Sequence, residues 1–289
     1  MIYSIENDKI KVQIDSMGCE MVSLYNKRDD KELIWKGDAA VWKRHAPILF
    51  PLVGRYRDDE CRIDGKTYRS TQHGFARDSE FMLLAKGDEF ISFTLPIIGD
   101  EHSDAFPYKC LLNIMYRING SLVDVCVDVM NKDVRPINFS LGGHPAFVYG
   151  DCESLTGCKI RFNDVKKVNY RLLDSNGLLT DQTYTLPLDG DGKVEVTKDF
   201  FDRDAYVIDN NQVKSVSLIR DGEAFITVKS DAPVFGIWSK KGFNNPFICI
   251  EPWYGCSDSA DFEGEIYERA YNNWLDVDET FTFKYSIRI

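Results

Sequence analysis

The chain has 289 residues, of which 44% are hydrophobic and 28% are charged, a balance typical of a globular protein with a large core. Its formal net charge of -11 argues against binding to nucleic acid or to an anionic membrane surface, because both require a basic face that neutralises phosphate. No signal segment precedes the first strand-like residues, and no stretch approaches the roughly 18–20 apolar residues of a membrane span. We therefore expect a cytoplasmic protein with neither a nucleic-acid partner nor a membrane partner.

Alternation of apolar and polar residues dominates the chain. It begins at 10–15, returns at 123–129 and closes the sequence at 281–289. Each stretch places an apolar row on one face and a polar row on the other, which is typical of half-buried antiparallel strands. Turn signals separate such stretches at Asp64-Gly65, Asn119-Gly120, Asn176-Gly177 and Asp189-Gly190-Asp191-Gly192.

Helical periodicity is nearly absent from the sequence. Short helices are expected only around 38–44, 198–204 and 257–262. No linker, low-complexity tract or repeat interrupts the chain, and its eight cysteines are dispersed without a C-x-x-C pair, so we expect reduced thiols. We predict an all-β fold in which residues 1–289 form a single domain of large, twisted antiparallel sheets packed face to face.

Rare residues concentrate in three short segments whose compositions an ordinary strand or turn does not predict. His73 and His144 each lie beside a glycine in a Phe/Pro-rich context, and glycine lets the backbone approach a ligand closely. Glu251 follows the apolar run 247–250 and is expected at the end of a buried strand, where desolvation raises the pKa of a carboxyl toward that of a working base. The segments are 47–55 with 72–78, 141–147, and 248–255.

Each of these residues also has an ordinary structural interpretation. A lone histidine or glutamate at a strand end is more often a hydrogen-bonded structural residue than a catalytic one. Arg55 and Arg77 are equally well explained by pairing with surface acids, and Trp253 by packing at the core or its rim. The concentration in three segments is what favours a functional site.

The three segments resemble those of the aldose 1-epimerase, or galactose mutarotase-like, superfamily. The resemblance begins at Gly18-Cys19-Glu20-Met21-Val22-Ser23-Leu24 and continues over nearly the whole chain to the last strand. Residues 72–77, 143–147 and 249–255 are most similar to the mutarotase-related proteins encoded near bacterial lactose and galactose operons. The resemblance implies a large antiparallel β-supersandwich with few short helices, in which a sugar occupies an open cleft.

The resemblance also implies roles for individual residues. A glutamate matching Glu251 is the general base, and a histidine matching His144 is the general acid. A histidine matching His73 binds and orients the sugar. An arginine matching Arg55 and an aspartate matching Asp204 contact the sugar hydroxyls.

The identity of the sugar is open at this point. Better-known galactose mutarotases have a longer N-H-x-H-G-G element, which is shortened here to Gln72-His73-Gly74-Phe75. The form Gln-His-Gly-Phe-Ala-Arg also resembles hexose-6-phosphate mutarotases, in which the arginine matching Arg77 helps to hold the phosphate. Trp253 is expected to contribute to sugar binding.

Interconversion of the anomers of an aldose needs only two proton transfers, so no cofactor and no metal is expected. Glu251 would remove the proton of the C1 hydroxyl while His144, as imidazolium, protonates the ring oxygen. The ring opens, the C1–C2 bond rotates, and closure reverses the roles. We expect an isomerase that acts on an aldohexose such as galactose or glucose, or on a hexose phosphate, as a monomer or homodimer.

Three alternatives to that enzyme differ in what they require. A non-catalytic sugar-binding protein on the same scaffold would use the same aromatic residues. A metal site of two histidines and one carboxylate, from His73, His144 and Glu251, lacks an H-x-H or H-E-x-x-H spacing. A glycoside hydrolase requires paired carboxylates flanking the bond, whereas the rare-residue segments pair glutamate with histidine.

Overall fold

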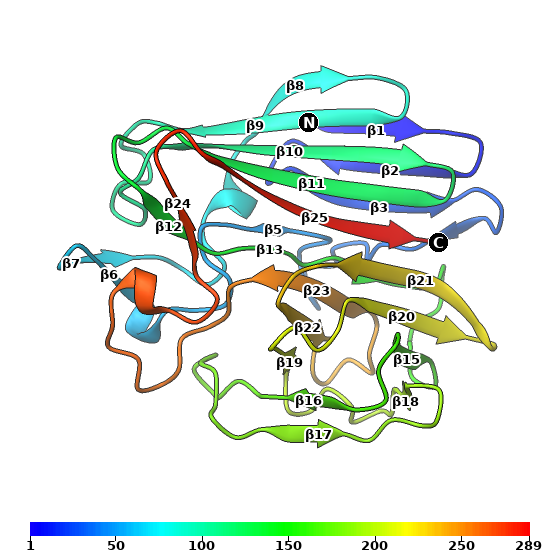
Figure 1. Ribbon diagram of the computed structural model, residues 1–289. Coiled ribbons are helices and arrows are strands. Elements are labelled where there is room, and N and C mark those ends of the chain that lie inside the picture. The colour runs from blue at the N-terminus through cyan, green and yellow to red at the C-terminus, as the bar shows by residue number, and fades with distance from the viewer.

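The computed structural model describes residues 1–289 and consists of antiparallel strands with three 3-10 helices of three residues each (Figure 1). The helices are η1 (Arg57–Asp59), η2 (Ala76–Asp78) and η3 (Ile266–Glu268). None of them has the length and apolar character needed to cross a membrane. The all-β prediction is confirmed.

The expected helices at 38–44, 198–204 and 257–262 are turns, so those predictions are wrong. Short polar side chains in these segments compete for the backbone amides that a helix would use. Asp38 Oδ1, for example, accepts the Ala40 N–H at 3.0 Å, and the Asp38 carbonyl accepts the N–H groups of Val41 at 2.9 Å and Trp42 at 2.8 Å. The chain therefore folds back after one turn instead of continuing as a helix.

The largest sheet has nine strands, and the last strand of the chain lies in its interior, between β11 and β21 (Figure 1). The predicted alternation holds there, because Val123, Val125, Val127 and Val129 of β11 are all fully buried. In spatial order the strands are β18 (Lys193–Glu195), β15 (Lys159–Phe162), β20 (Ser215–Arg220), β21 (Glu223–Ser230), β25 (Thr280–Arg288), β11 (Leu122–Asn131), β10 (Cys110–Asn119), β9 (Phe90–Ile97) and β8 (Met82–Lys86).

A six-stranded sheet packs against β25 of the large sheet. The ring of Tyr254 lies 5.2 Å from that of Phe281 and 5.5 Å from that of Phe283, so aromatic residues of the two sheets meet edge to face. The strands are β19 (Tyr206–Ile208), β22 (Val234–Trp238), β23 (Ile248–Tyr254), β13 (Leu141–Gly143) and β5 (Ile48–Leu49), with β14 (Ala146–Phe147) also paired to β23.

A four-stranded sheet covers the other half of the large sheet. Tyr3 packs edge-on against Phe93 at 5.4 Å, and the Tyr116 hydroxyl donates to the Cys19 carbonyl at 2.7 Å. The strands are β1 (Ile2–Glu6), β2 (Ile10–Asp15), β3 (Glu20–Asn26) and β4 (Lys31–Glu32). Three ribbons complete the fold: β6 (Glu60–Ile63) with β7 (Lys66–Arg69), β12 (Ile137–Phe139) with β24 (Asn273–Leu275), and β16 (Val168–Tyr170) with β17 (Tyr184–Leu186).

The six-stranded sheet has a gap beside the middle of β23. Gly142 of β13 pairs with Trp253, and Ala146 of β14 pairs with Cys249, while the chain between β13 and β14 leaves the ladder. Pro252, which has no N–H to give to a ladder, lies in the stretch of β23 that lacks a strand partner on this side, while on the other side it pairs with Phe235 of β22. The strand therefore runs on through the proline, and the gap leaves room for a side chain between the two short strands.

Candidate active site

His144 and Glu251, called the acid–base pair below, meet in this gap. Their side chains are 9% and 2% exposed, and His144 Nε2 lies 3.1 Å from Glu251 Oε2. The His144 N–H donates to the Pro47 carbonyl at 3.0 Å, which anchors the loop that carries the imidazole. Glu251 lies in the middle of β23, so its expected position at a strand end is wrong. The reason is that β23 continues through Pro252 to Tyr254.

Two glycines flanking β23 make room for the indole of Trp253. A Cβ at Gly236 would lie 2.5 Å from the Trp253 ring, and a Cβ at Gly142 would lie 2.7 Å from it. Because these distances are shorter than van der Waals contact, any larger residue at either position would displace the indole. Trp253 is 5% exposed, lines the same cavity as Glu251, and its Nε1 has no hydrogen-bond partner within the protein.

Burial opposes charge on both members of the acid–base pair. Desolvation raises the pKa of Glu251 well above its ordinary value; the Trp253 indole opposes this shift, and the Asp204 carboxylate adds to it. Desolvation, with a smaller contribution from the guanidinium of Arg77, lowers the pKa of His144 to about 3. In the empty site, therefore, burial favours the uncharged forms, a protonated carboxyl beside a neutral imidazole.

His73 lies next to His144 of the acid–base pair, and its hydrogen bond defines which tautomer it adopts. Its ring centroid is 5.6 Å from that of His144, with the two rings nearly perpendicular. The Gly54 N–H donates to His73 Nδ1 at 3.1 Å, so the proton of the neutral ring is on Nε2. Desolvation, His144 and Arg77 hold the pKa of His73 well below its ordinary value. His73 is thus a neutral donor at neutral pH.

An aromatic wall that the sequence patterns do not predict encloses His144. Trp42 stacks on its imidazole with ring centroids 5.0 Å apart, and Trp238 approaches edge-on at 5.7 Å. Trp35 fixes the wall from behind by donating its indole N–H to the Trp42 carbonyl at 2.8 Å. The only local signal in the sequence is a tryptophan within segment 38–44, which the same sequence predicts to be a short helix.

The pair opens into a cavity of about 310 Å³, near the lower limit of small-molecule sites. Arg77, Asp204 and Lys240 line it together with His73 and Trp253. A larger hollow of about 750 Å³ lies at the surface elsewhere and contains no histidine. The predicted residues therefore converge on the smaller cavity, with one exception.

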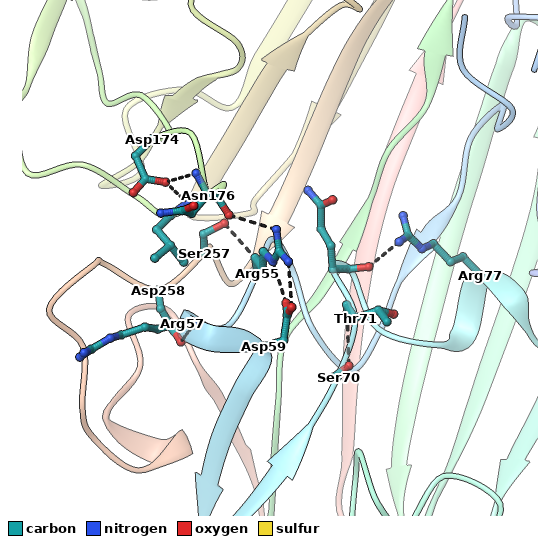
Figure 2. A network of polar contacts seen from close by, with 12 residues as sticks. Arg55, Arg57, Asp59, Ser70, Thr71, Arg77, Asp174, Asn176, Ser257 and Asp258 are labelled. Carbon is teal, nitrogen blue, oxygen red and sulfur yellow. Dashed lines mark hydrogen bonds and ion pairs between the residues drawn. The ribbon is translucent and has the colours of Figure 1, made fainter. Parts of the chain in front are cut away.

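That exception is Arg55, which does not line the cavity and whose guanidinium points toward Asp59 and Asn176 (Figure 2). Its Nε and Nη2 donate to the two carboxylate oxygens of Asp59 at 2.6 and 2.8 Å, and Nη1 donates to the Asn176 carbonyl at 3.3 Å. Its backbone N–H donates to the Ser257 hydroxyl at 3.1 Å, and Ser257 lines the cavity. In this structure Arg55 adjoins the cavity wall and its charge is already paired.

Arg77 lines the cavity and is only weakly paired. One Nη donates to the Gln72 carbonyl, while Nε is buried without a hydrogen-bond partner (Figure 2). The nearest carboxylate oxygen, from Asp78, is 3.8 Å from Nε, and both oxygens of Asp78 already accept from Arg44 Nη2 at 2.9 and 3.0 Å. Desolvation lowers the pKa of Arg77 to about 10. The Arg77 cation is therefore available to an anionic or hydroxyl-rich ligand.

Asp204, which directly precedes Ala205 and β19, also lines the cavity. Its backbone has a φ of 69°, and its Oδ1 accepts the Ala205 N–H at 2.8 Å, which leaves the other carboxylate oxygen without a hydrogen bond to the protein. Lys240 lines the same part of the cavity and forms no ion pair. The cavity thus offers acceptors and donors around a deeply buried acid–base pair.

Known proteins share both this fold and much of this sequence. A family model described as aldose 1-epimerase matches residues 1–272. A galactose mutarotase related enzyme from Lactobacillus acidophilus has a TM-score of 0.92 at 32% identity, covering 100% of this chain and 97% of that one. A galactose mutarotase-like protein from Lactobacillus casei has a TM-score of 0.92 at 30% identity, covering 100% and 99%. Protein LacX of Lactococcus lactis subsp. lactis is 28% identical over 282 residues, which are 93% of this chain and 92% of LacX. The chain therefore belongs to the aldose 1-epimerase family.

Proposed function

We propose that the protein interconverts the α and β anomers of an aldohexose by acid–base opening and closure of the sugar ring. The observation that carries the proposal is the contact of 3.1 Å between His144 Nε2 and Glu251 Oε2 at the base of a cavity of about 310 Å³. One acid and one base side by side are what the two proton transfers of this reaction require.

Glu251 removes the proton of the C1 hydroxyl, and His144 delivers a proton to the ring oxygen. After ring opening the carboxyl is protonated and the imidazole is neutral, which is the distribution that burial favours in the empty site. The buried surroundings therefore stabilise the pair in the state that accompanies the open-chain aldehyde. Ring closure reverses both transfers: Glu251 returns its proton to the C1 oxygen while His144 takes the proton of the attacking hydroxyl, which restores the carboxylate and the imidazolium.

The surrounding residues supply position rather than proton transfer. His73 offers its Nε2–H as a donor to a hydroxyl, and Asp204, on the wall of the same cavity, offers an acceptor. Trp253 presents an indole whose N–H has no partner within the protein. We propose that these three side chains hold the sugar, with Arg55 supporting the wall through the Ser257 hydroxyl.

A hexose phosphate is the second candidate substrate, and the cations of the cavity favour it. Arg77 has a buried Nε without a partner, and Lys240 forms no ion pair. The two cations lie on the wall of the same cavity, and a phosphate is the group that such cations bind most strongly. A neutral hexose would use the same groups as hydroxyl donors.

Exchange NMR and polarimetry of pure α-glucose, α-galactose and glucose 6-phosphate test both candidates. We expect accelerated anomer exchange, a loss of about 10²–10⁴-fold in Glu251→Gln and in His144→Ala, and retained sugar binding in both variants. The exposed Glu263, changed to Gln, serves as the matched control. Arg77→Gln should raise KM for the phosphosugar much more than KM for glucose, because the variant loses the charge but keeps a hydrogen-bond donor. Rates equal to buffer with every sugar, alongside measurable binding, would instead identify a non-catalytic sugar-binding protein.

A further inference from the structure

A thiol lies next to the acid–base pair. Cys249 and Glu251 are two residues apart on β23 and project to the same face of the strand. One ligand atom each from His144, Cys249 and Glu251 lies within 4.8 Å of the others, and all three residues are buried. Cys249 packs among Trp35, Phe247 and their neighbours, behind the cavity.

Two of these three groups have unfilled hydrogen-bonding capacity. Glu251 Oε2 is buried and accepts no well-aligned hydrogen bond, although His144 Nε2 lies 3.1 Å from it, and His144 Nδ1, on the other side of the imidazole, is also buried without a partner. Buried polar atoms without a partner are rare in folded proteins and call for an explanation. The side chains that carry them converge with a soft sulfur ligand, and an imidazole, a thiolate and a carboxylate together form a ligand set that suits Zn²⁺.

We propose that His144, Cys249 and Glu251 form a binding site for Zn²⁺, and that zinc bound there inhibits the protein. The inhibition, unlike the binding, rests on the proposed function, because the metal would occupy both members of the acid–base pair. Three protein ligands leave a fourth tetrahedral position, which is the arrangement of an open zinc site.

The geometry requires a small contraction of the cluster. Zinc bonds of about 2.0–2.3 Å at tetrahedral angles place ligand atoms about 3.4–3.6 Å apart. The His144–Glu251 contact of 3.1 Å is already slightly shorter, and the widest separation in the cluster is at most 4.8 Å. A movement of about 1 Å by the Cys249 thiol closes the set. The cavity, which His144 and Glu251 line, is the route of entry.

The charges of the three ligands balance that of a bound Zn²⁺, which favours the metal at this buried site. The thiol loses its proton and the pair loses the one that it holds, and both protons pass to solvent. The thiolate and the carboxylate then neutralise the two charges of Zn²⁺. A neutral complex replaces a set of uncharged groups, so no net charge is left in the buried site.

Cobalt spectroscopy of the full-length protein, stripped of metal with a chelator, tests the site independently of activity. We expect bound Co²⁺ to give a thiolate-to-cobalt charge-transfer band in the near ultraviolet. Added Zn²⁺ should displace the cobalt and so abolish the band. Cys249→Ala should lose the band, while Cys256→Ala, a change at another buried cysteine of the same region, should keep it. Cys249→Ser, checked by circular dichroism, keeps the test open should the alanine variant fold poorly.

Zinc titration of anomer exchange tests the inhibition. We expect zinc to stop exchange reversibly in the wild type and in Cys256→Ala, and to require at least about tenfold more metal in Cys249→Ala, since even changes around metal ligands cost 10–100-fold in affinity. No cobalt band in the wild type, or an equal band in Cys249→Ala, would overturn the site. A clear band in a protein inactive on every sugar would leave the site standing and remove only the proposed function.

Discussion

Replacing Glu251 by glutamine should make the protein progressively more stable, relative to the wild type, as the pH rises. Glutamine has nearly the shape of the protonated carboxyl and, like it, can donate to His144 Nε2 across the contact of 3.1 Å. It therefore preserves the neutral form that burial favours and removes only the ionisable group. The difference in stability between the two proteins therefore measures the free energy of keeping this carboxyl protonated in the folded state.

The magnitude follows from the proton count. Glu251 is 1% exposed, and desolvation raises its folded-state pKa well above the ordinary value of 4.5, which applies to the unfolded chain. Above pH 4.5 the unfolded chain releases this proton while the folded chain keeps it, so wild-type stability falls as the pH rises toward the folded pKa. Each pH unit between the unfolded and the folded pKa costs up to about 1.4 kcal/mol. Glutamine carries no such cost.

Urea unfolding followed by tryptophan fluorescence measures the difference, since the chain has five tryptophans. Both proteins are unfolded at pH 5, 6 and 7 at constant ionic strength. The two free energies of unfolding should diverge steadily, with the variant gaining on the wild type. Groups common to both proteins, including His73, cancel in this comparison.

Parallel pH profiles for the two proteins would refute the reasoning. Such a result would mean that Glu251 is ionised in the folded protein at neutral pH, and that its partners compensate for burial. Divergence in the opposite direction would mean that the folded state stabilises the carboxylate. Either outcome would also remove the argument that the empty pair holds its proton in the neutral form.

Three further results are expected. Arg269→Ala should lower the free energy of unfolding in urea by about 3–5 kcal/mol, because it leaves the Asp258 carboxylate buried without its cation. The guanidinium donates to Asp258 at 2.6 Å, and both side chains are at most 3% exposed. A decrease below about 1 kcal/mol would contradict this. Gly236→Ala should slow anomer exchange at least about tenfold with little change in circular dichroism, because its Cβ would lie 2.5 Å from the Trp253 ring; full activity would show that the indole position is unimportant. Nitrogen-15 NMR should find His73 neutral at pH 6.5, with its proton on Nε2, since its pKa is well below the ordinary value. A half-protonated ring at that pH would rule this out.

Strand pattern and turns could be read from the chain because their signals are local. Alternating residues at 123–129 and 281–289 face the core in β11 and β25 as predicted, and Asn119-Gly120 joins β10 to β11. The short helices failed because side-chain hydrogen bonds at positions such as Asp38 decide between a turn and a helix. That residues 1–289 form one folding unit stays a prediction.

The residues of the candidate site divide in the same way. The unusual composition of three segments is enough to single out His73, His144 and Glu251 from the sequence. Whether a given arginine faces the cavity depends on which acid lies nearest in space: Asp59 takes the guanidinium of Arg55, whereas Arg77 keeps a buried Nε without a hydrogen-bond partner. No sequence pattern contains that distinction.

The sequence by itself determined that the chain folds as antiparallel sheets, since apolar alternation with period two allows one buried face per strand. Only the tertiary structure brought His144 to Glu251, because the gap between β13 and β14 arises from how both short strands pair with β23. The same packing stacked Trp42 on His144 and placed Cys249 beside the pair. Distances between side chains far apart in the chain depend on strand order and register, which are set by long-range pairing and the shared core.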